Sequence, residues 1–209
     1  PDSDEVLQAI GEMDRTIGRL IFGLKARGLF ERVNILLVSD HGMAKTSPDS
    51  IIFLDDLIDM DLIKIIDGTP VAAIQPLGDL DSIYNILKNS NSAMDVYKKG
   101  EAPERLHYNN HRRIQPLTLS AKEHWSISTN SYFIEDDHAQ RFSGATHGYD
   151  PKYVSMRGIF LAHGPAFKKN FNGPGLSNIH LYEMMCKILG ISPANNDGKI
   201  DSTAIFLKN

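Results

Sequence analysis

The sequence is poor in several features that would point to particular protein classes. Its 209 residues contain one cysteine, Cys186, which excludes both an internal disulfide framework and a metal cluster built on thiolates. The net charge of -4 gives no general attraction for nucleic acid or for an anionic membrane, so we expect no binding to nucleic-acid duplexes. No apolar run is long enough to cross a bilayer, no secretory signal is visible, and the first residue is Pro1 rather than methionine.

The hydrophobic pattern predicts strands that alternate with helices. Apolar residues recur at steps of three and four from Val6 to Leu24, which is typical of a long amphipathic helix with Asp2 or Ser3 as its cap and Gly28 at its exit. The run 33–40, "VNILLVSD", follows directly and predicts a central parallel strand covered on both faces. We therefore expect an α/β protein with a mostly parallel sheet between layers of helices, and a smaller lobe inserted over residues 68–130.

Further along the chain, the pattern predicts more elements of both kinds. Residues 70–90 indicate a strand, a turn and a helix that begins near Asp79 or Asp81, and 104–121 and 124–130 indicate two strands. Residues 132–156 have no period and are interpreted as a loop, in which Asp136 and Asp137 solvate the surface. The run 157–167 predicts another buried strand, ended by Gly164-Pro165. A last helix is expected over about 179–189, with Asn178 as its cap and Gly190 at its end.

Two stretches place histidines where chemistry can occur. Asp40 and His41 come directly after the apolar run 35–38, and ligands of such sheets bind beyond the carboxyl ends of the strands. Gly42 lets the backbone turn there without a Cβ penalty. A carboxylate oxygen and an imidazole nitrogen form a typical partial ligand set for zinc or a similar divalent ion. The alternative is a strand-terminal aspartate that caps the next turn, with His41 merely exposed.

His147 repeats this arrangement between two glycines, Gly144 and Gly148. A histidine with glycine at its flank can be approached closely by an ion or a substrate. The alternative is a loop histidine that is hydrogen-bonded to its surroundings. His107 and His111 are interpreted as surface or packing residues, because their flanking pattern is strand-like, and His138 as a residue of a polar loop. His180 begins the last predicted helix. His163 ends a predicted strand before Gly-Pro and could lie near the site, and it is left as a structural residue.

Four blocks, in order along the chain, resemble the nucleotide pyrophosphatase/phosphodiesterase family of the alkaline phosphatase superfamily. They are "NILLVSDHGM" at 34–43, "PERLHYNNHRRIQPLTLSAKEHWSI" at 103–127, "GATHGYDPKYVSMRGIFLAHGPAFK" at 144–168 and "NIHLYEMMCKILGISPANNDG" at 178–198. One departure is His124, which stands where the family usually has glycine before tryptophan. The resemblance implies an alkaline phosphatase-like fold and a hydrolase of phosphodiester or pyrophosphate bonds that acts on a nucleotide or another small phosphodiester.

The same resemblance implies two zinc ions that bridge a phosphoryl group. By position, Asp40 and His41 would bind one zinc and His147 the other. The family's threonine nucleophile and its remaining ligands lie upstream of the position of Pro1, so no catalytic nucleophile is expected within residues 1–209. We therefore expect the chain to be the C-terminal part of a single catalytic domain, with an N-terminal half as its partner and no turnover alone. An extracellular or secretory location is suggested by the resemblance only.

Two other functions remain open from the sequence. A sulfatase or a phosphomutase of the same superfamily would share the turn at 40–43, and a sulfatase would need an upstream cysteine or serine that becomes formylglycine. A noncatalytic module that keeps the fold is the second alternative. It would be favoured if no threonine and no Asp…His pair were encoded upstream.

Overall fold

The computed structural model describes residues 1–208, and the side chains of Asp136 and Asp137, which the sequence places at the surface, lie outside the described part. The chain divides into two units. Apart from Pro1, which groups with the first unit, the first is the continuous segment 41–157, and the second combines 2–40 with 158–208. The expectation of a smaller lobe at 68–130, within a single catalytic domain over 1–209, stays a prediction.

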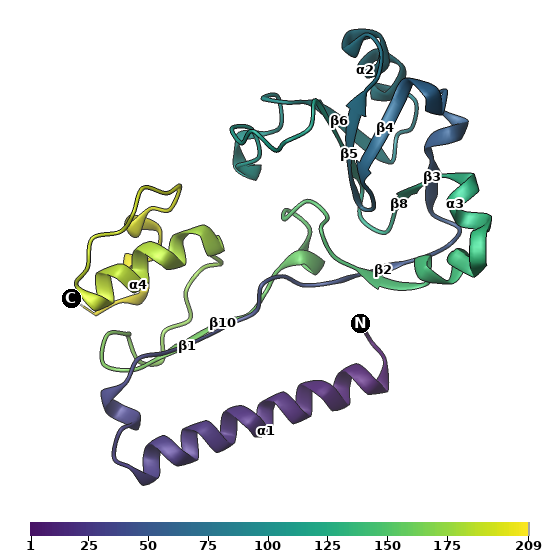
Figure 1. The fold of residues 1–209 in the computed structure, drawn as a ribbon. Helices are drawn as coiled ribbons and strands as arrows, with labels where there is room; N and C mark the ends of the chain where they lie inside the picture. Colours follow the sequence, from purple (N-terminus) through teal and green to yellow (C-terminus); the bar gives the residue numbers. More distant parts are fainter. Residues whose placement is uncertain (209) are drawn as a thin grey trace. The chain divides into compact units, whose positions relative to one another are not determined.

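The first unit is built on a four-stranded antiparallel sheet in the order β4-β5-β7-β6 (Figure 1). These strands are Ile63–Asp67, Val71–Pro76, Leu117–Ala121 and Met94–Lys98. Strand β5 alternates half-buried and buried residues, as expected for a sheet with one face against a core. Helix α2, Leu80–Lys88, buries Ile83 and Leu87, and the Asp79 side chain accepts a hydrogen bond from the Ser82 amide at 2.8 Å as its cap. The strand, turn and capped helix predicted over 70–90 are confirmed.

Two short strand pairs and a short helix complete the first unit. Strands β3, Ile51–Phe53, and β8, Ser126–Ser128, are parallel, whereas β2, Ala44–Thr46, and β9, Gly144–Thr146, are antiparallel. Helix α3 spans Asn130–Ile134, so the stretch interpreted as a loop contains a helix and a strand. The reason is that β9 forms by pairing with β2 and has no apolar period of its own. The predicted strand at 104–121 is also shorter, because 104–106 forms a 3-10 turn.

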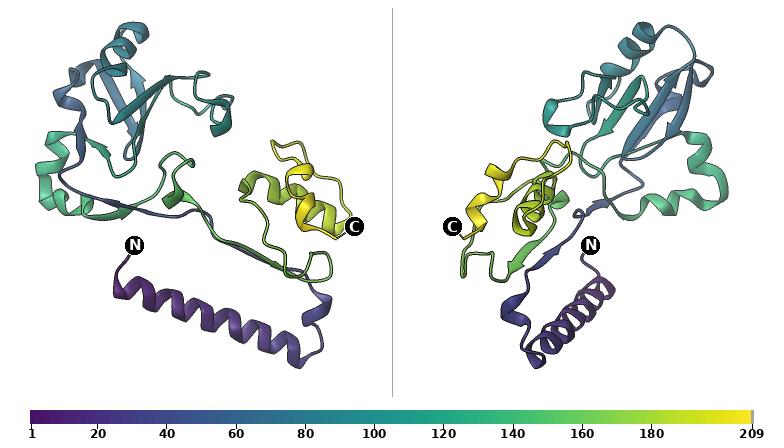
Figure 2. Two further views of the ribbon diagram at one scale, coloured as in Figure 1. Left: turned by 180° about the vertical axis from the view of Figure 1, so that it is seen from behind. Right: turned by 60° about the vertical axis from the view of Figure 1, so that its left-hand side comes forward.

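The second unit contains the long helix, a two-stranded ribbon and the closing helix. Helix α1, Asp4–Ala26, is capped by the Ser3 hydroxyl and followed by Gly28 at φ 67°, as predicted. Helix α4, Leu181–Leu189, ends at Gly190 as predicted, but it begins after His180, with the turn 178–180 before it and no side-chain cap. Strands β1, Ile35–Val38, and β10, Phe160–His163, run side by side in both views (Figure 2).

The partner of β1 differs from the prediction. In the described residues β1 pairs with β10, and the pairing is antiparallel, with Ile35 opposite His163 and Val38 opposite Phe160. Its residues are half-buried or exposed rather than covered on both faces. A two-stranded ribbon has no further layer to cover its faces. The apolar side chains of β1, which predicted a central strand, are therefore partly exposed to solvent in this structure.

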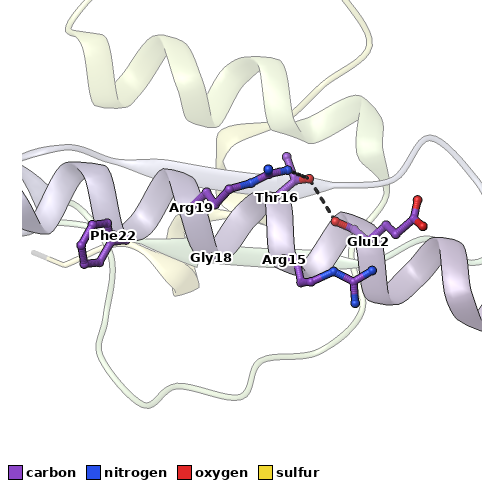
Figure 3. Close-up of a pocket in the computed structure, with 6 residues that line it drawn as sticks. All are labelled: Glu12, Arg15, Thr16, Gly18, Arg19 and Phe22. Carbon is purple, nitrogen blue, oxygen red and sulfur yellow. Dashed lines mark hydrogen bonds between the residues drawn. The ribbon is translucent and has the colours of Figure 1, made fainter.

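The same holds for α1, which has no buried residue. Several large apolar side chains on it are exposed: Val6, Leu7, Ile10, Met13, Leu20 and Phe22. A pocket on this helix is lined by α1 residues alone, among them Glu12, Arg15 and Phe22, and the Arg19 guanidinium donates to the Thr16 hydroxyl there (Figure 3). It is therefore an open helix face and no enclosed ligand cavity. Across residues 1–208, no helix has both the length and the apolar character needed to cross a membrane.

We expect the 209-residue chain, expressed alone, to bind a dye that fluoresces on apolar surfaces, because α1 and the β1–β10 ribbon expose several large apolar side chains. Changing Ile10 and Met13 to glutamine should lower the fluorescence, whereas changing Asp14 and Lys25 to glutamine should leave it unchanged. A chain that binds no dye would show that this surface is covered in solution.

Candidate metal centre

His41 is fixed by the chain immediately around it. Its ring is half-buried, and its Nδ1 lies 2.8 Å from the carbonyl oxygen of Gly42. A carbonyl oxygen only accepts, so Nδ1 carries the proton and Nε2 of the neutral ring carries the lone pair. Metal-binding histidines are commonly oriented in this way, by a hydrogen bond from the other ring nitrogen. The tautomer of His41 is therefore the one that suits a cation at Nε2.

Gly42 is required by a close approach of two backbone segments. Its amide donates to the Met156 carbonyl at 3.0 Å, and a Cβ at this position would lie 1.9 Å from the Ser155 carbonyl oxygen. Gly42 is not among the residues with positive φ. The glycine after His41 thus admits the 155–157 segment beside it, rather than supplying an unusual turn conformation as the sequence suggested.

His147 follows β9 and meets His41 through the pairing of β9 with β2. In that pair Ala44, three residues after His41, lies opposite Thr146, which directly precedes His147. The rings of His41 and His147 are stacked, with centroids 3.8 Å apart and planes inclined by 18°. The structure therefore brings together two of the three predicted ligands, from opposite ends of the first unit.

Asp40 belongs to the second unit, where its side chain is exposed. Within the described residues, no group of three or more His, Cys, Asp or Glu side chains has the arrangement of a metal site. The pair of imidazoles is thus what this chain assembles. The roles of Asp40, His41 and His147 as ligands stay a prediction.

The turn after His147 is anchored by buried and charged contacts. Gly148 has φ 99°, and Tyr149 is buried with its hydroxyl donating to the Trp125 carbonyl at 3.0 Å. Burial raises the pKa of Tyr149 to about 12. The Asp150 carboxylate accepts two hydrogen bonds from the Arg105 guanidinium, at 2.6 and 2.5 Å, and a third from the Lys152 amide at 2.9 Å. These bonds, chiefly those from Arg105, lower the pKa of Asp150 to about 2.

The unusual residue His124 has a structural explanation. Its φ of 73° lies in the left-handed region, where glycine has no Cβ penalty. The His124 ring compensates in part, because its Nδ1 lies 2.9 Å from the Lys45 carbonyl oxygen and so ties this turn to β2. The neighbouring Glu123 accepts a hydrogen bond from the hydroxyl of Ser155, in the segment beside Gly42.

The other histidines have structural contacts, as the sequence predicted for them. His163 stacks on Phe30, with ring centroids 4.0 Å apart, and His180 Nδ1 accepts a hydrogen bond from the Lys199 amide. His107 adopts φ 49° after a 3-10 turn, and His111 accepts from the Arg113 amide at 3.3 Å. The strand expected around these last two residues is absent from the described structure, since 104–114 forms turns.

Arg105 and Asp150 were missed by the sequence reasoning. Asp150 stands three residues after His147, which was a usable signal, but nothing in the sequence links it to Arg105. Their contact joins segments 45 residues apart, and it becomes visible only with the fold.

Comparisons with known proteins give matches to the family that the sequence resembles. The sequence profile described as type I phosphodiesterase / nucleotide pyrophosphatase matches residues 1–150. Bis(5'-adenosyl)-triphosphatase enpp4 of Xenopus laevis is 41% identical over 199 residues, which are 95% of this chain and 42% of that protein. The chain thus spans less than half the length of this curated relative.

Solved structures of similar proteins cover the whole chain. Human ectonucleotide pyrophosphatase/phosphodiesterase 5 matches with a TM-score of 0.88 and 38% identity over 100% of this chain and 54% of that one. An inactive threonine-to-alanine variant of the murine protein, in complex with AMP, matches with a TM-score of 0.87 and the same identity and coverage. These matches confirm the resemblance seen in the sequence and the alkaline phosphatase-like α/β fold class, and the coverage fits a C-terminal portion of such a domain.

Replacing Gly42 with alanine should destabilise the first unit by about 1–3 kcal/mol, because the added methyl would overlap the Ser155 carbonyl. Gly68→Ala is the matched control: a Cβ there meets nothing within 4 Å, and the change should stay within about 0.5 kcal/mol. Urea denaturation measures both. Equal midpoints would contradict the close approach at Gly42.

Asp150 should make stability depend on pH in the acid range. Its carboxyl has a lower pKa in the folded chain, about 2, than the usual value of about 3.9, so the unfolded state binds more protons between these values. The stabilisation is complete above about pH 4 and is lost as the pH falls through 2. We expect Asp150→Asn to cost about 1 kcal/mol at pH 7 and progressively less below pH 4 in urea titrations. A pH-independent difference would contradict this origin.

Proposed function

The chain belongs to the type I phosphodiesterase/nucleotide pyrophosphatase family, and we propose that the full-length protein is a metal-dependent hydrolase of phosphodiester or pyrophosphate bonds. A nucleotide or a dinucleotide is the substrate class that the relatives support. One of them is a bis(5'-adenosyl)-triphosphatase, and another has been solved with AMP. The family match favours this function over that of a sulfatase or a phosphomutase.

The stacking of His41 and His147 is the observation that carries the proposal. The lone pair of an imidazole lies in the plane of its ring, so a bound ion lies close to that plane. Two nearly parallel planes whose ring centroids are 3.8 Å apart do not meet within a zinc–nitrogen bond length of about 2.1 Å. The pair therefore suits two ions, one for each ring, better than one shared ion.

In this proposal the residues of the chain hold and orient the ions. His41 presents Nε2 because its Nδ1 donates to the Gly42 carbonyl. Asp40 would hold the same ion as His41. His147 binds the second ion. When bound, zinc ions lower the pKa of a nucleophile and neutralise the charge on the phosphoryl oxygens. Pairing of β2 with β9 keeps the two imidazoles adjacent, so the spacing is set before any ion binds.

The nucleophile is proposed to be a threonine in an N-terminal half of the same protein. An inactive threonine-to-alanine variant of the murine relative supports this assignment. The same half would cover the apolar face of α1 and the β1–β10 ribbon, whose exposure supports a covering partner. Without that half, the chain should not turn over substrate.

We also propose that the full-length protein acts outside the cell or in a secretory compartment. The similar solved structures are described as ectonucleotide pyrophosphatases/phosphodiesterases, which supports this location. The proposed location rests on these relatives and not on a signal within residues 1–209. The single cysteine is compatible with an oxidising or a reducing compartment.

In the full-length protein, His147→Ala should reduce the zinc content from two ions to one and lower diester hydrolysis by about a hundredfold or more, because second-shell changes alone cost 10–100-fold. Metal analysis and a diesterase assay on the same samples measure this. His111→Ala is the control, since it removes an exposed imidazole that accepts a hydrogen bond from the nearby Arg113 amide. Full activity of His147→Ala would refute the ligand assignment.

Asp40→Asn should leave the melting temperature nearly unchanged, because the side chain is exposed, and it should weaken one ion selectively. Thermal unfolding and zinc titration distinguish the two alternatives raised by the sequence. Unfolding without a change in zinc affinity would favour the aspartate as a cap. A wild-type protein that binds no zinc and hydrolyses no diester would favour a noncatalytic module.

A further inference from the structure

His147 lies between the end of strand β9 and Gly148, a glycine whose backbone can adopt many conformations. Strand β9 ends at Thr146, where pairing with β2 also ends. Gly148 follows with φ 99°, and both His147 and Gly148 are exposed. Glycine restricts the chain less than any other residue. The direction of the His147 ring therefore depends on what fixes the chain just after Gly148.

Two contacts of different kinds fix the chain after Gly148, one made by Tyr149 and one by Asp150. Tyr149 is held by burial and by one hydrogen bond to the Trp125 carbonyl. Asp150 is held by the Arg105 guanidinium, which donates through both terminal nitrogens to the two carboxylate oxygens. Such a two-pronged contact fixes orientation as well as distance, because a planar fork matches a planar carboxylate.

The hydrogen bonds between Arg105 and Asp150 limit the movement of the turn at 147–150. The Asp150 side chain is only 11% exposed, whereas that of Arg105 is 48% exposed. Arg105 itself stands on a braced loop, because the amide and carbonyl of Ala102 both bond to the Asn109 side chain, at 3.0 and 2.7 Å. Lys152 reaches the same carboxylate at 3.3 Å from an exposed position, as a single point contact.

We propose that Arg105 is a positioning residue for His147: its paired hydrogen bonds to Asp150 hold the 147–150 turn so that the imidazole lies against His41. Asp150 is the third residue after His147, a span of at most about 10 Å, so a displaced carboxylate can change the direction of the ring. The inference rests on the proposed function, because the position of His147 matters for the ion that it binds.

The test compares variants of the full-length protein by zinc affinity, melting temperature and diester hydrolysis. Arg105→Gln should weaken the ion at His147 by about tenfold, as changes to residues that orient ligands typically do. Excess zinc should restore hydrolysis. Asp150→Asn keeps the shape of the side chain and should weaken the same ion in the same direction, and it serves if Arg105→Gln fails to fold. Arg105→Lys keeps the charge without the fork and should remain impaired in zinc affinity.

The matched control is Lys98→Gln, which breaks an ion pair of the same unit, Lys98–Asp81 at 2.5 Å, that shares no residue with the turn. Chelator competition should give the control the wild-type zinc affinity. In the zinc-free protein, the NMR signals of the His147 imidazole should shift in Arg105→Gln and Asp150→Asn, because the ring-current effect of His41 depends on stacking, and they should not shift in the control.

The outcomes separate the two levels of the proposal. If His147→Ala loses an ion while Arg105→Gln and Asp150→Asn bind zinc as the control does, Arg105 has a structural role only and the inference is overturned. If His147→Ala keeps both ions, the proposed function itself fails and the inference fails with it. Weakened zinc binding together with shifted His147 signals supports both.

Discussion

The antiparallel pairing of β2 with β9 is the constraint on which the candidate centre depends. Each strand is only three residues long, yet each directly adjoins a segment that carries a histidine: His41 stands before β2, and His147 stands after β9. The pairing brings the two rings to 3.8 Å. So short a pair is marginal by itself, because few hydrogen bonds offset the loss of backbone freedom. Contacts from residues outside the two strands must therefore stabilise this pairing.

Those contacts act on both strands. The His124 ring bonds to the Lys45 carbonyl of β2, and the Gly42 amide bonds to the Met156 carbonyl in the segment that closes the unit. Beyond β9, Tyr149 and Asp150 are anchored to Trp125 and Arg105. The contacts come from different parts of the first unit, and no single one of them spans the pair. The arrangement of the imidazoles is thus a property of the whole unit rather than of the two motifs.

The sequence predicted the elements whose signals are local. The apolar period of α1, its Ser3 cap and the Asp79 cap of α2 are all properties of adjacent residues, and the structure has them. Strand β9 was missed because "GAT" has no apolar alternation and becomes a strand only by pairing. The antiparallel partner of β1 was missed for a related reason, since an apolar run indicates burial without indicating its neighbour. His41 and His147 were identified as candidates from their positions beside glycines and from the family resemblance, but Arg105 depends on a contact that no spacing indicates.

The first unit is one uninterrupted stretch of chain, and the hydrogen bond between Gly42 and Met156 brings its two ends together. A segment whose two ends lie close together tolerates insertions and deletions, because its loops can change length without altering the path of the chain before and after the segment. Variation in length is therefore tolerated best in those loops of 47–140 that do not carry Arg105, His124 or Trp125, away from the closing bond and from the two histidines. A change in the spacing between 41 and 46, or between 144 and 150, would instead shift one imidazole out of register with the other.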